Sequence, residues 1–190
     1  MKTIKIALRI FIVLTLITGV AYPLAVTGLS QVLFHSKANG SLIHKDDKII
    51  GSALIGQKTD SAIYFSPRPS AIDYNPLPSG GSNFGLTNAK LVKQVNDRKA
   101  AFIKINGLDK NTEVPSDMLF ASASGLDPHI SPRAAFLQVK RIAETRHFTI
   151  TQKNKLTQLV KEKTEVPQIG ILGEERVNVL ELNIALDKLK

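Results

Sequence analysis

The sequence predicts an extracytoplasmic α+β domain, with a mixed sheet and several helices, anchored by one N-terminal transmembrane helix. Two observations support this fold class. A long uncharged segment near the N-terminus is typical of a membrane span. The rest of the chain mixes strand and amphipathic helix patterns, without the strict alternation or internal repeat of a doubly wound sheet. Residues 35–190 suffice to bury a core without disulfides, although the sequence contains no Cys.

The uncharged segment runs from residue 10 to residue 34 and exceeds the roughly 20 residues that a bilayer core requires. Eleven of the side chains at 10–29 are Leu, Ile, Val or Phe, which favours insertion by roughly 3 to 7 kcal/mol. Gly19-Val20-Ala21 also fits a signal-peptide cleavage site. We favour an uncleaved anchor, because apolar residues continue beyond Ala21 as far as Leu29.

The charges around this segment predict its orientation. Lys2, Lys5 and Arg9 precede it, and the first acid in the chain is Asp46. By the positive-inside rule, residues 1–9 form a cytoplasmic N-terminus, residues 10–34 cross the inner (plasma) membrane once, and residues 35–190 fold on the periplasmic or extracellular side. The sequence thus predicts a single-pass protein whose main domain lies outside the cytoplasm.

Small residues and a proline within the span predict an irregularity and a packing face. Pro23 lacks the N–H of a helical hydrogen bond and crowds the carbonyl of Gly19, so we expect a kink. Gly19 and Ala25 belong to T-x-x-x-G and A-x-x-x-A patterns on which another helix can pack closely. Gly19, Pro23 and Ala25 are therefore candidate helix-packing residues, although small residues also occur in solitary anchors.

The outer domain begins with strand patterns and continues with a long loop. Residues 41–56 predict two short apolar strands around an Asp46-Asp47 turn, and residues 63–65 predict a third strand. Residues 66–87, here named the Pro/Gly loop, show no period and contain four prolines and a Ser-Gly-Gly-Ser sequence. A structureless stretch of this length is usually functional or disordered.

Capping residues and apolar spacing predict four helices after this loop. The first begins at Thr87 or Asn88, the second at Ser131-Pro132, and the last at Asn178 with Glu181 three residues later. Residues 118–121 predict another strand, and residues 176–182 fit a strand as well as a helix. The side chains expected to face inward are Leu91, Val95, Phe102, Ile105, Ala135, Val139, Ile142, Leu156, Leu159, Val160, Val179, Leu182, Leu186 and Leu189.

Few residues fit a catalytic or metal site. Ser124, Asp127 and His129 have the residue types of a hydrolase, but they are close neighbours on a turn, and no G-x-S-x-G sequence occurs. The Ser-Gly-Gly-Ser sequence lacks the lysine of a phosphate-binding loop, and the four histidines lack metal-ligand spacing. Dispersed basic residues disfavour nucleic acid. We therefore expect no catalytic or metal residues, and a membrane-anchored extracytoplasmic hydrolase is the alternative.

The Pro/Gly loop is the strongest candidate for protein recognition. It carries Arg68, Asp73, Asn75 and Asn83 on a backbone stiffened by prolines, so docking would cost little conformational entropy. A loop that simply packs on its own domain is an equally good reading.

Six blocks of the sequence resemble the C subunit of the Kdp potassium-transporting P-type ATPase, in the same order and over nearly the whole chain. They are YPLAVTGLSQ at 22–31, ANGSL at 38–42, GSALIGQ at 51–57, YFSPRPSAIDYNPLPSGGSN at 64–83, SGLDPHISP at 124–132 and VNVLELNIALD at 177–187.

The resemblance implies an accessory subunit that is not itself an enzyme. In that family a channel-like A subunit selects potassium, a B subunit hydrolyses ATP, and a small F subunit accompanies them. The C subunit is needed for assembly and acts as a catalytic chaperone that raises the ATP affinity of the B subunit, with its outer domain over the potassium entrance. ATP and potassium would be handled by the complex, with no cofactor held firmly by this chain. The candidate subunit-contact or entrance-loop residues are then Arg68, Asp73, Asn75, Asn83, Asp127 and His129.

Overall fold

The computed structural model describes residues 2–189, and the chain divides into two compact units at the bond between Ile50 and Gly51. The first unit contains the helices α1 (Lys2–Leu16), η1 (a π-helix, Ile17–Ala21), α2 (Tyr22–Leu33) and α3 (His35–Ala38), and the strand β1 (Leu42–Lys45). The strand β2 (Lys48–Ser52) crosses the boundary between the units and pairs with β1.

The apolar segment forms one continuous helix from Lys2 to Leu33, with a mean hydropathy of 2.1, and it is long and apolar enough to cross a membrane. The helix thus includes basic residues that were expected only to precede the span. It ends before Phe34, whose φ of −136° departs from helical geometry. Its side chains are exposed, except for the half-buried Ser30 and Gln31.

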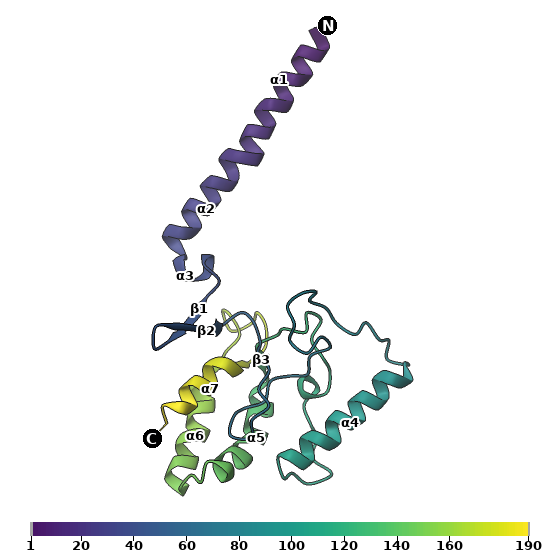
Figure 1. Ribbon diagram of the computed structural model, residues 1–190, viewed down its shortest axis with the longest axis vertical. Helices are drawn as coiled ribbons and strands as arrows, with labels where there is room; N and C mark the ends of the chain where they lie inside the picture. Colours follow the sequence, from purple (N-terminus) through teal and green to yellow (C-terminus); the bar gives the residue numbers. More distant parts are fainter. Residues whose placement is uncertain (1, 190) are drawn as a thin grey trace. The chain divides into compact units, whose positions relative to one another are not determined.

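A π turn takes the place of the predicted kink. The N–H of Tyr22 donates to the carbonyl of Ile17, five residues back, and α2 starts with Pro23 in its first turn. The wider turn relieves crowding between the proline ring and the preceding carbonyl groups. In Figure 1, α1 and α2 follow one another without a sharp bend.

The hairpin of β1 and β2 has the expected turn. Asp46 and Asp47 have φ angles of 49° and 60°, and two consecutive positive φ angles are typical of the tight turns that join antiparallel strands. Asp tolerates this region better than most residues, because its short side chain can hydrogen-bond locally.

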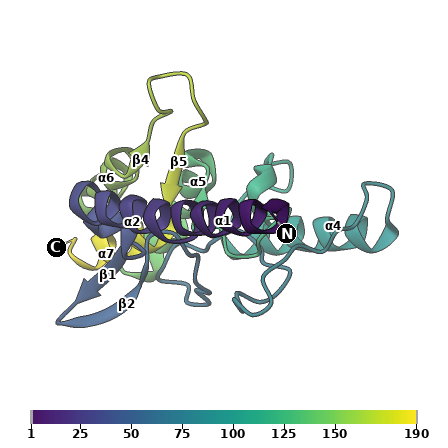
Figure 2. The ribbon, with the colours of Figure 1, turned by 90° about the horizontal axis from the view of Figure 1, so that it is seen from above.

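The second unit contains most of the remaining elements. Its helices are α4 (Ala89–Ile105), η2 (a 3-10 helix, Ser116–Met118), α5 (Pro132–Thr145), α6 (Ile150–Glu162) and α7 (Val179–Asp187), and its strands are β3 (His129–Ile130), β4 (Thr164–Glu165) and β5 (Arg176–Asn178). In Figures 1 and 2, α5, α6 and α7 gather around the small sheet, and α4 lies on the other side of the Pro/Gly loop.

The helix starts agree with the predicted caps. The side chains of Asn88, Ser131 and Asn178 accept hydrogen bonds from the first turns of α4, α5 and α7, and Thr149 with Gln152 forms a capping box on α6. The predicted inward faces of α5, α6 and α7 form the core, together with Phe65, Phe102 and Val177. Ile105 is the exception on α4, since it is 59% exposed.

Three strand predictions need correction. The three-stranded sheet has the order β3-β5-β4 and is antiparallel throughout, not mixed, with Ile130 and Thr164 both opposite Val177. Residues 176–182 combine both readings, because β5 ends at Asn178 and α7 begins at the next residue. Residues 63–65 and residues 118–121 are not strands. Side chains satisfy the backbone of the former, and the latter begins in the 3-10 helix η2.

Candidate functional site

The segment leading into the Pro/Gly loop is held by polar side chains from distant helices. Phe65 is fully buried, and its N–H and carbonyl bond to Oδ1 and Nδ2 of Asn183 on α7 at 2.8 and 3.0 Å. Gln138 on α5 does the same for Ser66, at 2.7 and 3.2 Å. These amide side chains supply the donors and acceptors that a neighbouring strand would otherwise give. The backbone at Phe65 and Ser66 is thus satisfied without a sheet, just after a turn in which the N–H of Tyr64 donates to the carbonyl of Ser61 at 3.1 Å.

Arg141 on α5 completes this anchorage. Its guanidinium donates to the carbonyl oxygens of Ala62 and Tyr64, to Oδ1 of Asn106 and to Oε1 of Gln138. Burial lowers the pKa of Arg141. Within residues 2–189, the guanidinium forms no ion pair with a carboxylate. Neutral oxygens therefore compensate its charge, and this side chain fixes the backbone at 62–64.

The Pro/Gly loop packs on residues 122–130, here named the Asp127 loop. The N–H of Gly80 donates to the carbonyl of Ser124 at 3.0 Å. Gly125 has a φ of +70°, and a Cβ there would lie 2.5 Å from Cγ1 of Ile72 and 2.9 Å from the carbonyl oxygen of Gly80. Only glycine fits this approach of the two backbones. The hydroxyl of Tyr74 donates to the carbonyl of Arg68, and burial raises the pKa of Tyr74 to about 12.

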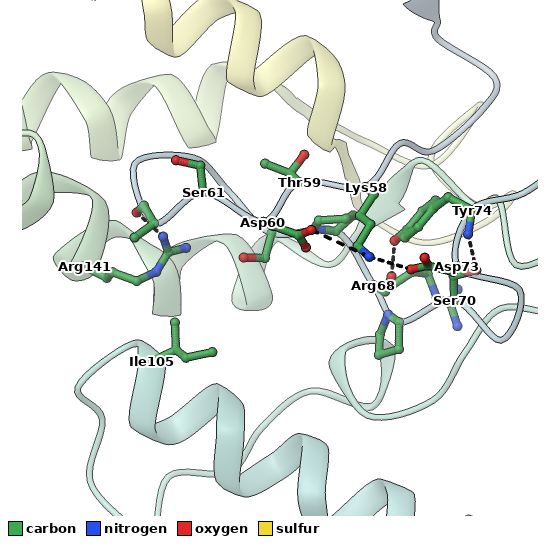
Figure 3. Close-up of a pocket in the computed structure, with 14 residues that line it drawn as sticks. Lys58, Thr59, Asp60, Ser61, Arg68, Ser70, Asp73, Tyr74, Ile105 and Arg141 are labelled. Atoms are coloured by element: carbon green, nitrogen blue, oxygen red, sulfur yellow. Dashed lines mark hydrogen bonds and ion pairs between the residues drawn. The ribbon is translucent and has the colours of Figure 1, made fainter.

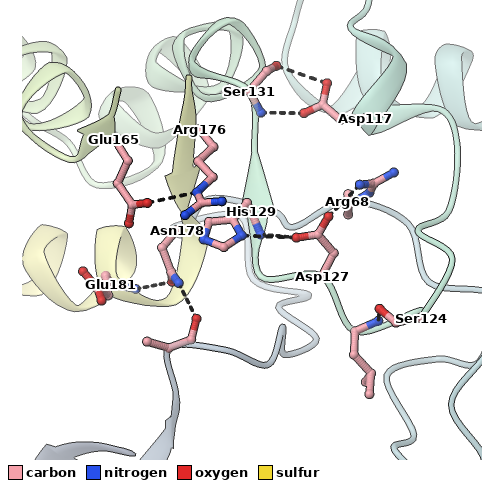
Figure 4. Close-up of polar contacts among 12 residues, drawn as sticks. Arg68, Asp117, Ser124, Asp127, His129, Ser131, Glu165, Arg176, Asn178 and Glu181 are labelled. Carbon is pink, nitrogen blue, oxygen red and sulfur yellow. Dashed lines mark hydrogen bonds and ion pairs between the residues drawn. The ribbon is translucent and has the colours of Figure 1, made fainter. Parts of the chain in front are cut away.

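Three of the predicted contact residues, Arg68, Asp127 and His129, meet in what we name the polar cluster (Figure 4). Nη1 of Arg68 lies 2.7 Å from Oδ2 of Asp127, and both side chains are more than two-thirds buried. Oδ1 of Asp127 accepts from the backbone N–H of His129 at 3.0 Å and lies 3.3 Å from its Nδ1. Burial alone would raise the pKa of Asp127, but the contacts with His129 and Arg68 lower it to about 2. The carboxylate therefore stays ionised and ties the Pro/Gly loop to the Asp127 loop.

The other predicted loop residues lie outside this cluster. Asp73 has a φ of 53° and pairs with Nζ of Lys58 at 2.8 Å, with its side chain 76% exposed. Oδ1 of Asn75 accepts from the N–H of Leu77 at 3.1 Å, a local turn contact. Asn83 is exposed and also has a positive φ. These three residues shape the loop surface and do not contact the polar cluster.

The hydrolase reading lacks its essential contact. The hydroxyl of Ser124 accepts from the N–H of Leu126 at 3.1 Å, and in Figure 4 it lies on the opposite side of Asp127 from His129. No hydrogen bond joins Ser124 to His129 in the part of the chain that the structure describes. A nucleophile without its base cannot be activated in the usual way.

Arg68 lines three open cavities, two of which are bordered by several other charged side chains. One, of about 490 Å³, is lined by Lys58, Asp73, Tyr74 and Arg141 among others (Figure 3). The other, of about 760 Å³, lies over Asp127 and His129 and is bordered by Arg133, Arg176, Glu113, Glu174 and Glu175. Across residues 2–189, no group of three or more His, Asp or Glu side chains is placed to hold a metal ion. Side chains of both charges surround Arg68 in these cavities. This arrangement suits binding to a polar surface better than catalysis.

The sequence analysis did not identify the polar residues whose side chains hold the backbone that leads into the Pro/Gly loop. Gln138, Arg141 and Asn183 are polar, yet each lies beside a predicted inward apolar residue on its helix. Their buried positions are the signal, because a buried polar side chain needs a partner. Lys58 and Asp117 were also missed; Asp117 accepts from the N–H of Ser131 at 2.7 Å and so supports the start of α5.

The membrane helix places Gly19, Pro23 and Ala25 on its exposed surface. A Cβ on Gly19 would meet only Thr15 of the same helix, at 3.9 Å. Gly19 and Pro23 are four positions apart and share a face, whereas Ala25, two positions beyond Pro23, lies on roughly the opposite face. Helix packing at these residues stays a prediction.

Comparison with known proteins covers both units of the chain. Residues 4–188 match the family described as K+-transporting ATPase, c chain (KdpC). Relatives named potassium-transporting ATPase KdpC subunit include proteins from Geotalea uraniireducens, 50% identical over 100% of this chain and 99% of that protein, and Burkholderia cenocepacia, 50% identical over 94% and 92%. A Mycobacterium bovis relative of the same name is 47% identical over 96% of both chains. The chain therefore belongs to the KdpC family of potassium-transporting ATPase subunits.

Proposed function

We propose that this chain is a non-catalytic accessory subunit of a high-affinity, ATP-driven potassium uptake complex. The match to KdpC proteins along the whole chain, spanning helix included, is the observation that carries this proposal. Its partners are a channel-like A subunit that selects potassium, a B subunit that hydrolyses ATP, and a small F subunit. The separation of Ser124 from His129 counts against the hydrolase alternative.

The proposed topology is a single pass with the N-terminus in the cytoplasm of the cell and the main domain outside. It rests on the three basic residues before the uncharged run and on the long apolar helix. Protease added to right-side-out spheroplasts should cleave within residues 51–190 and leave the N-terminal end protected. Cleavage only after the cells are opened would contradict this orientation.

An external domain can raise the ATP affinity of the B subunit only through coupling across the membrane, since ATP is cytoplasmic. Coupling of this kind typically amounts to 1–3 kcal/mol, or about 5- to 150-fold in affinity. The prediction is measurable as the ATP concentration that half-saturates potassium-stimulated hydrolysis by the purified ATPase, with and without this chain. Specific labelling of residues 51–190 by a photoreactive ATP would contradict the coupling route and favour direct binding.

A substitution of Ser124 distinguishes the accessory subunit from the hydrolase alternative. Ser124→Ala should leave assembly and potassium-stimulated ATP hydrolysis unchanged, since the Ser124 hydroxyl makes only a local turn contact. Loss of a turnover on changing Ser124 would support the hydrolase. Absence of the wild-type chain from the purified ATPase would contradict the accessory role.

The Pro/Gly loop is proposed to shape the potassium entrance rather than to select the ion, because selectivity requires a closely coordinated ring of oxygens. Asp73 is the candidate acid for this role, since it is exposed to solvent even though it pairs with Lys58, whereas Asp127 is part-buried between Arg68 and His129. Asp73→Lys should weaken the apparent potassium affinity of uptake. An unchanged affinity would count against any role at the entrance.

A further inference from the structure

The chain between β4 and β5 extends beyond the sheet as a narrow arm, residues 166–175, which Figure 2 shows projecting past both strands. The arm is ordered by its own backbone. The N–H groups of Gln168 and Leu172 each donate to the other residue's carbonyl at 2.9 Å, and the N–H of Gly170 donates to Pro167 at 3.0 Å. At its base, Arg176 pairs with Glu165 at 2.9 Å across the two strands.

The tip of this arm is apolar and exposed. Ile169 and Ile171 are 87% and 81% exposed, and Val166 and Leu172 are also exposed. Single exposed aliphatic residues are common, but four within seven residues on a projecting turn form a concentrated apolar surface. Burying the two isoleucine side chains against a partner would remove apolar area from water and so stabilise a complex.

The backbone of the tip gives an independent indication. Ile169 has a φ of +57°, a region that β-branched residues rarely adopt and in which their backbone is strained. Glycine or asparagine would form the same turn without that cost. A turn that keeps isoleucine here presents its side chain at the expense of local stability, which is typical of a residue used for contact.

The charges of the arm indicate which kind of surface covers it. Residues 166–175 contain no Lys, Arg, Tyr or Trp, the residues that hold peripheral segments at a lipid surface. They contain Glu174 and Glu175, and neither forms an ion pair among the described residues. These two glutamates at the foot of the arm would be repelled by an anionic membrane. They fit a protein surface that carries basic side chains at its edge.

We propose that the arm at 166–175 is a docking element, whose apolar tip inserts into a hollow with a basic rim on another subunit of the potassium-transporting ATPase. This inference rests on the proposed function, which supplies the assembly, and adds to it a contact element for the outer domain. The isoleucines provide burial, and Glu174 and Glu175 provide the charge complement of the rim.

Site-specific photocrosslinking in the full-length chain tests the proposal. A benzophenone amino acid at position 171 in membranes should give an adduct that mass spectrometry identifies as a subunit of the ATPase. The matched control is position 150 on α6, because Ile150 is 82% exposed and lies in the same unit. Adducts with lipid only, or equal yields at positions 150 and 171, would overturn the docking role.

A variant measures the strength of the contact. Ile169→Ser with Ile171→Ser should increase the rate at which the chain dissociates from the detergent-purified ATPase by tenfold or more, whereas Ile150→Ser should leave it unchanged. Thermal unfolding of each variant checks that the fold persists. If the wild-type chain co-purifies and the double variant dissociates at the same rate, the arm proposal fails alone; if the wild-type chain does not co-purify, the proposed function fails.

Discussion

Two segments of the second unit lack regular structure and are organised in opposite ways. The chain at 62–66 has its backbone groups bonded by buried side chains from α5 and α7, whereas the arm at 166–175 is closed only by its own backbone and leaves its isoleucines exposed. The first segment is tied to the core by the buried side chain of Phe65 and by these hydrogen bonds, although Ala62 at its start is exposed. The second depends on the rest of the domain only at its base, so its side chains are free to serve a contact outside the chain.

The comparison predicts that the anchors of the first segment carry much of the domain's stability. Arg141→Leu should lower the free energy of unfolding by about 3 to 5 kcal/mol, because several buried acceptors lose their donor and each costs about 1 to 3 kcal/mol. Urea unfolding of the full-length chain in detergent measures the loss. Arg133→Leu is the control on the same helix, since its pair with Glu113 is exposed to solvent and such pairs contribute little to stability. Equal losses of unfolding free energy for the two variants would show that the buried arginine stabilises the domain no more than the exposed one.

A smaller loss is expected at the amide that holds Phe65. Asn183→Leu deprives the buried N–H and carbonyl of Phe65 of their partners, and we expect a loss of about 2 to 3 kcal/mol. The same denaturation experiment on Asn154→Leu, an exposed position on α6, provides the reference. A stability equal to that of the reference variant would show that water replaces the lost contacts and that the segment is not held as described.

The polar cluster adds a pH-dependent link between the Pro/Gly loop and the Asp127 loop. The pKa of Asp127 is lowered from 3.8 to about 2, so its contribution is present above about pH 4 and is lost as the pH falls toward 2. Asp127→Asn should cost about 1 to 2 kcal/mol near pH 7, and the difference from wild type should narrow between pH 4 and pH 2. Asp109→Asn, at an exposed turn, should show no such convergence. A constant difference across this range would assign the loss to packing instead of charge.

The sequence was most informative where structure is decided locally. Asn88, Ser131 and Asn178 start helices within a few residues of their own position, and Asp46-Asp47 defines its turn in the same way. The strand predicted at 63–65 was wrong because its hydrogen-bond partners are Asn183, Arg141 and Arg146, which lie roughly 80 to 120 positions away.

In the candidate site, too, local features could be predicted from the sequence and long-range contacts could not. The residue types of the Pro/Gly loop marked it as a contact region, but the pairing of Arg68 with Asp127, 59 positions apart, depends on how two loops pack. The sequence-based candidates also omitted the arm, because four exposed aliphatic residues look like core residues until the fold shows that they face solvent.

Substitutions in the arm should have the smallest effect on stability, because its side chains contribute little to the core. The sign of that effect follows from the strain at Ile169. Ile169→Asn removes an 87% exposed side chain that contributes little to the core and places a residue that tolerates a φ of +57° in the turn. The free energy of unfolding should therefore stay within about 0.5 kcal/mol of wild type or rise slightly, whereas Ile171→Asn, at a residue without positive φ, should not rise. Urea unfolding of the two variants side by side makes the test. A loss of 2 kcal/mol or more at Ile169 would mean that the arm is held by its side chains after all, and the two irregular segments would then be organised by the same principle.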